Sequence, residues 1–288
     1  MLIILGVTSA QAQKLSGITS DIVKILDGVE GCFAVGVYDL QHQDKLFINP
    51  DTVFHAASTM KTPVMIELFR QADAGELRLE SEVTITNEFK SIVDGSPYTL
   101  EVGDDSDSVL YNQLGSKKTV RELVRLMITV SSNLATNILI ELADAKKVMA
   151  TMKSISANDI RVLRGVEDTK AFNLGMNNQV TARDLVTLFR TLAEGKLANK
   201  QSTDEMINIL ADQKFNSIIP VLLPSGTRVA HKTGSITGVE HDTGIVFMPD
   251  GRSYIIVLLS KQLSDAKVGK RTLAQVSKRV YEYFNTMK

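Results

Sequence analysis

Residues 227–260, TRVAHKTGSITGVEHDTGIVFMPDGRSYIIVLLS, decide the fold class of this chain. Segments 227–233, 240–248 and 252–260 are rich in Val, Ile and Thr, which is the composition of β-strands. The sequence Pro249-Asp250-Gly251 is a turn that joins the last two segments. We therefore expect three consecutive antiparallel strands near the C-terminus.

In the rest of the chain, strands are predicted near the N-terminus, whereas the middle of the chain is predicted to be mostly helical. Residues 31–39 and 44–49 are predicted strands with a polar turn between them, and residues 14–27 and 265–287 have helical periodicity. Further helices are predicted from helical periodicity and capping residues. One begins at Thr119, where Glu122 completes a capping box, and another begins at Ser202. The others cover 58–73, 132–144, 146–153 and 182–194, the last with Thr181 as its N-cap.

Strands and helices do not alternate along the chain, which favours an α+β fold over a doubly wound one. We predict a five-stranded antiparallel sheet built from both ends of the chain, with flanking helices and an inserted all-α lobe. The α/β lobe covers about 13–57 and 214–288, and the α lobe about 58–213, within a single domain 13–288. A cleft between two lobes is the natural place for a site.

The bulk composition is that of an ordinary globular protein and excludes some classes of partner. Of 288 residues, 44% are apolar and 23% charged, with 32 Lys plus Arg against 33 Asp plus Glu. A net charge of -1 gives no electrostatic basis for binding nucleic acid. The single cysteine, Cys32, allows no intramolecular disulfide, and the four histidines lack zinc-ligand spacing, so no metal and no cofactor is predicted.

The N-terminus indicates export. The apolar run 2–7 precedes Ala10-Gln11-Ala12, an A-x-A pattern of the kind that signal peptidase cleaves, although a basic segment before the run is missing. The run is too short to span a bilayer, and no cysteine near it could carry a lipid anchor. We predict a signal peptide over 1–12 and a secreted or periplasmic bacterial protein, without a membrane anchor and monomeric. An ordinary N-terminal strand is the alternative.

Three short patterns carry the chemistry. They are Ser58-Thr59-Met60-Lys61, then Ser131-Ser132-Asn133, then Lys232-Thr233-Gly234. Taken singly each pattern is weak, because a serine at a helix start is usually only an N-cap. Together they are a specific signal for one enzyme class, because they occur in this order and because the first two begin helices and the third lies on a strand.

These residue types suit acyl transfer. Ser58 and Lys61 are one turn apart on a helix and share a face, so a lysine with a lowered pKa can accept the serine proton. Ser131 can relay a proton to a leaving nitrogen, and Asn133 can hold a substrate amide. Lys232 offers a positive charge to a carboxylate, and Gly234 lets a peptide-like substrate lie close to its strand.

On these residues the chain resembles the class A-type serine β-lactamases within the wider penicillin-recognising serine hydrolase family. The supporting stretches include 54–63, 130–137, 231–235 and 244–252. The resemblance implies the two-lobed fold, hydrolysis of a β-lactam amide, and antibiotic resistance. It also implies these roles: Ser58 nucleophile, Lys61 base, Ser131 proton relay, Lys232 and Thr233 carboxylate binding, and an oxyanion hole from the backbone N–H groups of Ser58 and Ser235.

The resemblance also implies a glutamate that activates the water for deacylation, and Glu167 is the candidate; a surface acid in a polar loop is the alternative. Several features depart from the family pattern. Ser132 stands where S-D-N has aspartate, and Ala171 stands where an asparagine normally holds the water, with Asn173 as a possible substitute. The loop after Glu167 is about two residues shorter by eye. Extra sequence over 95–116 contains an acidic run, which is either a solvated loop or a lip over the cleft.

Other functions compete with β-lactam hydrolysis. A D-Ala-D-Ala peptidase, or another amidase or esterase of the same fold, would use the same residues on a different substrate. A non-hydrolysing β-lactam-binding sensor would stop at the acyl adduct. A Ser-His-Asp triad is disfavoured, because His241 and Asp242 are adjacent and their side chains diverge on a strand.

Overall fold

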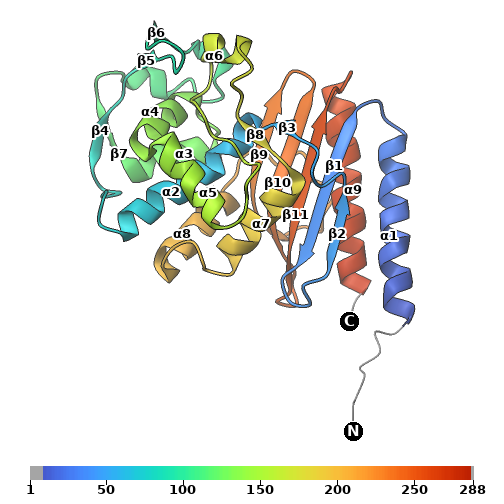
Figure 1. Cartoon of the computed structure of the whole chain (residues 1–288). Helices are drawn as coiled ribbons and strands as arrows, with labels where there is room; N and C mark the ends of the chain where they lie inside the picture. Colours follow the sequence, from blue (N-terminus) through green and yellow to red (C-terminus); the bar gives the residue numbers. More distant parts are fainter. Residues whose placement is uncertain (1–8, 287–288) are drawn as a thin grey trace.

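A five-stranded antiparallel sheet forms the centre of the molecule in the computed structural model, which describes the backbone of residues 9–286 and the side chains of residues 17–286 (Figure 1). The strand order is β2-β1-β11-β10-β9, so the early hairpin joins the edge of the late three-stranded meander. The strands are β1 (Cys32–Asp39), β2 (Lys45–Ile48), β9 (Arg228–Ile236), β10 (Val239–Phe247) and β11 (Ser253–Lys261). The predicted α+β class and the five-stranded sheet are confirmed.

Both faces of this sheet are covered, which explains why its strands are nearly continuous apolar runs. Successive residues of β11 point to opposite sides: Ile255, Val257 and Leu259 join one apolar cluster, and Ile256 and Leu258 join another. Helices α1 (Ser9–Asp27) and α9 (Ala266–Thr286) pack together on one face, and α7 (Ala182–Ala193) lies against the other (Figure 1). The sheet is therefore the middle of three layers.

The remaining helices pack together beside the sheet, and their apolar core is continuous with the face of the sheet that α7 covers (Figure 1). Its main helices are α2 (Lys61–Asp73), α3 (Val120–Thr129), α4 (Asn133–Ala143), α5 (Ala145–Ser154) and α8 (Lys200–Ala211). Shorter elements join them: α6 (Thr169–Asn173) and the 3-10 turns η1 (Ala57–Met60), η2 (Val102–Asp104) and η3 (Leu110–Gln113). The expected capping box of Thr119 and Glu122 is present, and Thr181 caps α7 through the backbone N–H of Asp184.

Three helix starts differ from the predictions. Helix α1 begins at Ser9 rather than at residue 14. The helix expected at Ser58 begins with the 3-10 turn η1, and regular α-helix starts only at Lys61. Helix α8 starts at Lys200 rather than Ser202, because the side chain of Asn199 accepts the N–H of Ser202 and forms the cap.

Three short antiparallel pairs escaped the sequence analysis. They are β3 (Phe54–His55) with β8 (Gln179–Val180), β4 (Glu82–Thr84) with β7 (Lys117–Thr119), and β5 (Phe89–Lys90) with β6 (Pro97–Tyr98). Two- and three-residue strands are too short to show a hydrophobic period. The first pair matters for the site, because it ties the segment before Ser58 to the end of the loop that carries Glu167.

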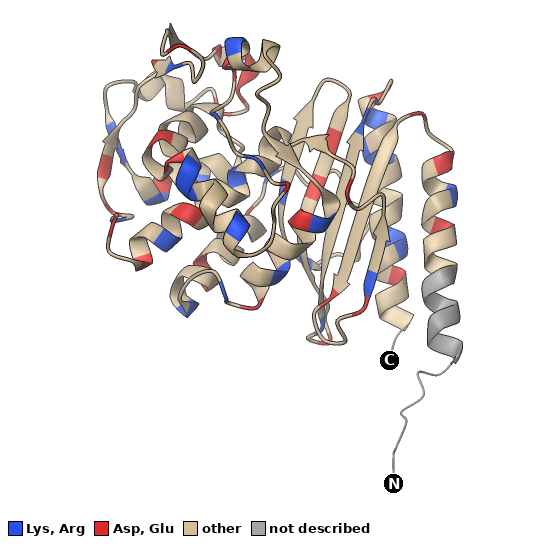
Figure 2. Cartoon of the chain, viewed as in Figure 1, with Lys and Arg blue, Asp and Glu red and all other residues tan. Residues whose placement is uncertain are grey.

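Charged residues of both signs are interspersed over the helices and the sheet edge in the view of Figure 2. None of the helices in the described part of the chain is both long and apolar enough to cross a membrane. The apolar run 2–7 of the expected signal peptide lies outside the described residues.

Candidate active site

Ser58 lies in the 3-10 turn η1, directly against strand β9. The turn is entered through Ala57, whose φ of 45° is in the left-handed region and redirects the chain. A Cβ on Gly234 would lie 3.1 Å from the backbone nitrogen of Ser58, so only a glycine lets the strand approach this closely. The K-T-G strand and the S-x-x-K turn therefore lie side by side at the site.

Lys61 is fully buried, and its ammonium group contacts the second motif. Its Nζ donates to the backbone oxygen of Ser131 at 2.7 Å and to the Oδ1 of Asn133 at 2.9 Å, and it lies 3.2 Å from Ser131 Oγ. Burial lowers the pKa of Lys61 to about 7, although the carboxylates of Asp105 and Glu167 partly oppose this shift. A lysine with this pKa is a competent general base near neutral pH.

Lys61 and Ser58 are not hydrogen-bonded to each other in the described part of the chain. Within the described residues, no hydrogen bond involves the Ser58 hydroxyl, and the contacts of Lys61 Nζ go to Ser131 and Asn133. Such contacts are often long in a free enzyme and tighten around the substrate. Ser58 remains half-buried and open to the cleft.

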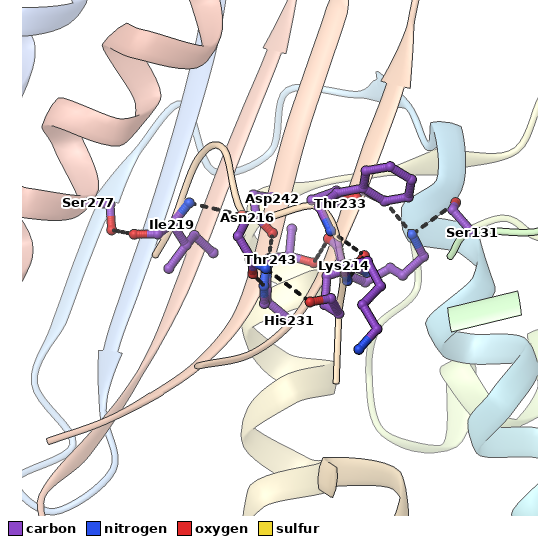
Figure 3. Close-up of polar contacts among 12 residues, drawn as sticks. Ser131, Lys214, Asn216, Ile219, His231, Thr233, Asp242, Thr243 and Ser277 are labelled. Atoms are coloured by element: carbon purple, nitrogen blue, oxygen red, sulfur yellow. Dashed lines mark hydrogen bonds and ion pairs between the residues drawn. The ribbon is translucent and has the colours of Figure 1, made fainter. Parts of the chain in front are cut away.

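Ser131 is held between two lysines. Lys232 Nζ donates to Ser131 Oγ at 3.1 Å and to the backbone oxygen of Thr233 at 2.9 Å, and Figure 3 shows the hydroxyl of Ser131 facing this group. Burial, reinforced by the nearby Lys61, holds the pKa of Lys232 well below its ordinary value. A hydroxyl that contacts both amines is placed to pass a proton between the nucleophile side and the leaving-group side of a substrate.

Glu167 reaches the same site from a loop more than thirty residues further along the chain. Its Oε1 accepts from Asn133 Nδ2 at 3.3 Å and its Oε2 accepts from the backbone N–H of Glu101 at 3.0 Å. Burial raises the pKa of Glu167, which makes it a stronger base than a surface carboxylate. The following Asp168 anchors the loop, because its carboxylate accepts from Ser91 Oγ and two backbone N–H groups.

The two positions expected to help hold a water are both poorly placed for it. Ala171 is fully buried in the short helix α6, and Asn173 is exposed and is not among the residues that line the cleft. The polar amide that contacts Glu167 is that of Asn133. The sequence pattern therefore located the glutamate, but the group that supports it comes from a different motif.

The acidic insertion lies as a lip over the cleft. The carboxylate of Asp105 accepts the backbone N–H groups of Asn133 and Leu134, each at 2.9 Å, at the start of helix α4. The backbone oxygen of Asp104 accepts from the Asn133 side chain, and Ser106 lines the cavity. Of the two alternatives for this run, the lip is the one that the structure adopts.

Ser132, the residue that replaces aspartate in the second motif, has a local role. It is fully buried and caps α4 through the backbone N–H of Ala135. An acid still contacts this helix start, but it is Asp105, from the insertion. Sequence analysis missed Asp105, since nothing in the acidic run distinguished it from its neighbours.

Two connected hollows meet at Ser58. One cavity of about 270 Å³ extends over the K-T-G strand toward α9 and is lined by Ser58, Ser106, Ser131, Phe215, Ser217, Ile218, Thr233, Ser235, Glu240 and Lys270. The other, of about 450 Å³, extends past Glu167 and has a more apolar wall that includes Val166, Phe172 and Ile236. A substrate that lies across Ser58 can therefore place a polar group in the first cavity and an apolar group in the second.

A buried hydrogen-bonded pair, His231 and Asp242, lies behind the K-T-G motif and was not predicted from the sequence. His231 Nδ1 and Asp242 Oδ1 are 2.7 Å apart, and the second oxygen of Asp242 accepts the N–H of Ile219 (Figure 3). His231 also contacts Asn216. The adjacent His241 points elsewhere, with its Nε2 on the backbone oxygen of His55, so His241 and Asp242 diverge as the strand geometry predicted.

No group of three or more His, Cys, Asp or Glu side chains within the described residues is arranged to hold a metal ion. The cleft brings together a serine, two lysines with lowered pKa values and a carboxylate with a raised pKa. This set of residues is typical of serine hydrolases.

Comparison with known proteins agrees with this class. The model of the β-lactamase enzyme family matches residues 17–284, and the chain belongs to that family. It is 24% identical to the β-lactamase VEB-1 of Pseudomonas aeruginosa over 96% of this chain and 92% of the relative. It is 26% identical to a β-lactamase of Bacteroides uniformis over 96% of this chain and 94% of that one.

Solved structures give the same result for the fold. A mutant of PBP-A described as an acyl-enzyme complex with penicillin G has a TM-score of 0.81 at 26% identity, covering 95% of this chain and 98% of its own. The extended-spectrum β-lactamase TLA-1 also has a TM-score of 0.81, at 22% identity, covering 94% and 99%. The resemblance drawn from the motifs is confirmed, and the protein is a serine hydrolase of the β-lactamase type.

Proposed function

We propose that this enzyme hydrolyses β-lactam antibiotics through an acyl-enzyme on Ser58 and thereby confers resistance. The observation that carries the proposal is the fully buried Lys61, whose pKa is lowered to about 7 and whose Nζ lies against Ser131 and Asn133. A neutral amine in this position can accept the proton of Ser58 as its oxygen attacks the lactam carbonyl.

The remaining residues suit the steps that follow. The backbone N–H groups of Ser58 and Ser235 stabilise the negative charge that develops on the carbonyl oxygen. Ser131 Oγ delivers a proton to the ring nitrogen as the C–N bond breaks, and Lys61 passes the proton that it took from Ser58 to Ser131, whose Oγ lies 3.2 Å from Lys61 Nζ. Asn133 binds the substrate amide, and Thr233 contacts the substrate carboxylate next to the ring nitrogen.

Deacylation needs a base and a water. Glu167, with its raised pKa, accepts a proton from a water that attacks the acyl ester and releases Ser58. The Asn133 amide holds this carboxylate toward the cleft.

Hydrolysis of a chromogenic cephalosporin tests the proposal, with Ser58→Ala, Glu167→Gln and the control Glu141→Gln beside the wild type. Glu141 is an exposed residue of α4 that lines neither cavity at Ser58. We expect turnover in wild type and control, none in Ser58→Ala, and an acyl adduct on Glu167→Gln by intact mass. A wild type that stops at a one-to-one adduct contradicts hydrolysis.

A D-Ala-D-Ala peptidase is the second candidate, favoured by the buried Ala171 and by the likeness to PBP-A. Without an asparagine at that place, deacylation of a β-lactam adduct could be slowed by about 10²-fold. Release of D-Ala from a D-Ala-D-Ala peptide, with a stable penicillin adduct, would favour this candidate.

We also propose that the chain is exported to the periplasm and acts there as a monomer without a membrane anchor. The apolar run 2–7 and the A-x-A pattern that ends at Ala12 support export. N-terminal sequencing of the protein from a periplasmic extract tests it, with cleavage after Ala12 as the expected result.

A further inference from the structure

The acidic run of the insertion borders the cleft on the side of Glu167. Residues 101–107, which we call the acidic lip, contain four acids, namely Glu101, Asp104, Asp105 and Asp107. Within the described part of the chain, none of the four forms an ion pair with a lysine or an arginine. The negative charge of the lip therefore has no direct cationic partner.

Asp104 is the acid of the lip that lines the 450 Å³ cavity. It is exposed, and its backbone oxygen accepts from Asn133 Nδ2 at 3.3 Å. The carboxylate of Asp105 is occupied by the backbone N–H groups at the start of α4. The carboxylate of Asp104, by contrast, has no hydrogen bond to any other described residue, so it is available to a group on a substrate.

The charged groups that line this cavity have a negative sum. They are three carboxylates and one guanidinium, those of Asp104, Glu167, Asp168 and Arg164. Arg164 is buried, donates to backbone oxygens of its own loop, and has its charge opposed by the nearby Asp168. Asp104 and Glu167 remain, and the charge of Asp104 adds to the burial that raises the pKa of Glu167.

The acyl side of a substrate lies in this cavity in the proposed reaction. The substrate carboxylate is held at Thr233 in the other cavity, and the amide on the acyl side is held by Asn133, which lines the 450 Å³ cavity. A substituent on the carbon next to that amide therefore lies near Asp104. An aromatic ring on the same carbon can reach the apolar wall formed by Phe172 and Ile236.

We propose that Asp104 makes the site selective for substrates that carry an ammonium group next to the amide on the acyl side, over those that carry a carboxylate there. The inference deepens the proposed function and rests on acyl transfer at Ser58. An ammonium group at this place is attracted by Asp104 and Glu167, whereas a second carboxylate is repelled by both. The carboxylate held at Thr233 is unaffected, because it lies in the other cavity.

Three penicillins with the same ring system and the same phenyl group test this inference. Their acyl groups are phenylacetyl, α-aminophenylacetyl and α-carboxyphenylacetyl, so they differ in the charge next to the side-chain amide. The measured quantity is the second-order rate constant for acylation of Ser58. It equals kcat/KM where the adduct is hydrolysed, and it is followed as adduct formation by intact mass where the adduct is stable.

In the wild type, we expect the ammonium compound to react fastest and the carboxylate compound slowest. Asp104→Asn removes the charge and keeps the backbone bond to Asn133, and should lower the ratio of ammonium to carboxylate compound about fivefold. Asp104→Lys should reverse the preference. The control Asp27→Asn makes the same change at an exposed position at the end of α1 that lines neither cavity, and its ratio should equal that of wild type.

Salt separates a direct effect of charge from a change in the shape of the lip. At about 1 M KCl the Debye length falls to about 3 Å, so exposed charges are largely screened. The wild-type ratio should then approach that of Asp104→Asn, and the ratio of the variant should change less. A ratio that stays constant in wild type from low to high salt contradicts the inference.

The remaining outcomes separate this inference from the proposed function. If no penicillin forms an adduct on Ser58, the proposed acyl transfer fails. If adducts form without turnover, hydrolysis fails, and the ratio of acylation rate constants still tests the role of Asp104. If the wild type reacts fastest with the carboxylate compound, or Asp104→Asn leaves the ratio unchanged, the inference alone is overturned.

Discussion

Replacing Lys61 by methionine should remove activity and also change how stability depends on pH. In the wild type the pKa of Lys61 falls from 10.5 to about 7 because the side chain is fully buried. The unfolded chain keeps the ordinary pKa, so between pH 7 and 10.5 it binds a proton that the folded chain does not. The free energy of unfolding of the wild type therefore rises with pH across this window.

The magnitude follows from the pKa difference. At about 1.4 kcal/mol for each pH unit, the fall from 10.5 to about 7 disfavours the folded state by about 5 kcal/mol at pH below 7. The three contacts of Lys61 Nζ offset this by about 1 kcal/mol each. Methionine has a similar volume and no charge, so Lys61→Met should be about 2 kcal/mol more stable than wild type at pH 7.

Urea unfolding at pH 7.5, 8.5 and 9.5 measures the effect. Between pH 7.5 and 9.5 the wild type should gain about 2 to 3 kcal/mol relative to Lys61→Met. The control Lys153→Met, at an exposed lysine of α5, should follow the wild type. A difference between wild type and Lys61→Met that stays constant over this pH range would refute the lowered pKa.

Three further changes test the supports of the site. Asp105→Ala should lower kcat/KM by about 10²-fold, since the start of α4 and Asn133 lose their anchor. Because Asp105 raises the pKa of the catalytic lysine, the acid limb of the pH profile should also move to lower pH. Gly234→Ala should slow acylation at least about tenfold in stopped-flow assays, because its Cβ would press on the nucleophile's backbone. His231→Ala should lower the free energy of unfolding by about 3 kcal/mol in urea, because it leaves a carboxylate oxygen of the buried Asp242 without its hydrogen-bond partner; an unchanged midpoint would contradict this.

Local sequence signals predicted the elements well because their causes are local. The capping box at Thr119, the N-cap at Thr181 and the Pro249-Asp250-Gly251 turn each depend on residues within a few positions of one another. The start of α8 was wrong by two residues, since Ser202 and Asn199 are both good caps and only the folded chain selects one.

The sequence by itself determined which residues could do the chemistry, because the order Ser58, Lys61, Ser131, Lys232 matches one catalytic design. Only the tertiary structure decided how they act. The lowered pKa of Lys61 arises from burial by segments 70 residues away, and the folding of the insertion over the cleft set Asp104 in the same cavity as Glu167. Contacts between distant segments are fixed by how the layers pack, and no short pattern records them.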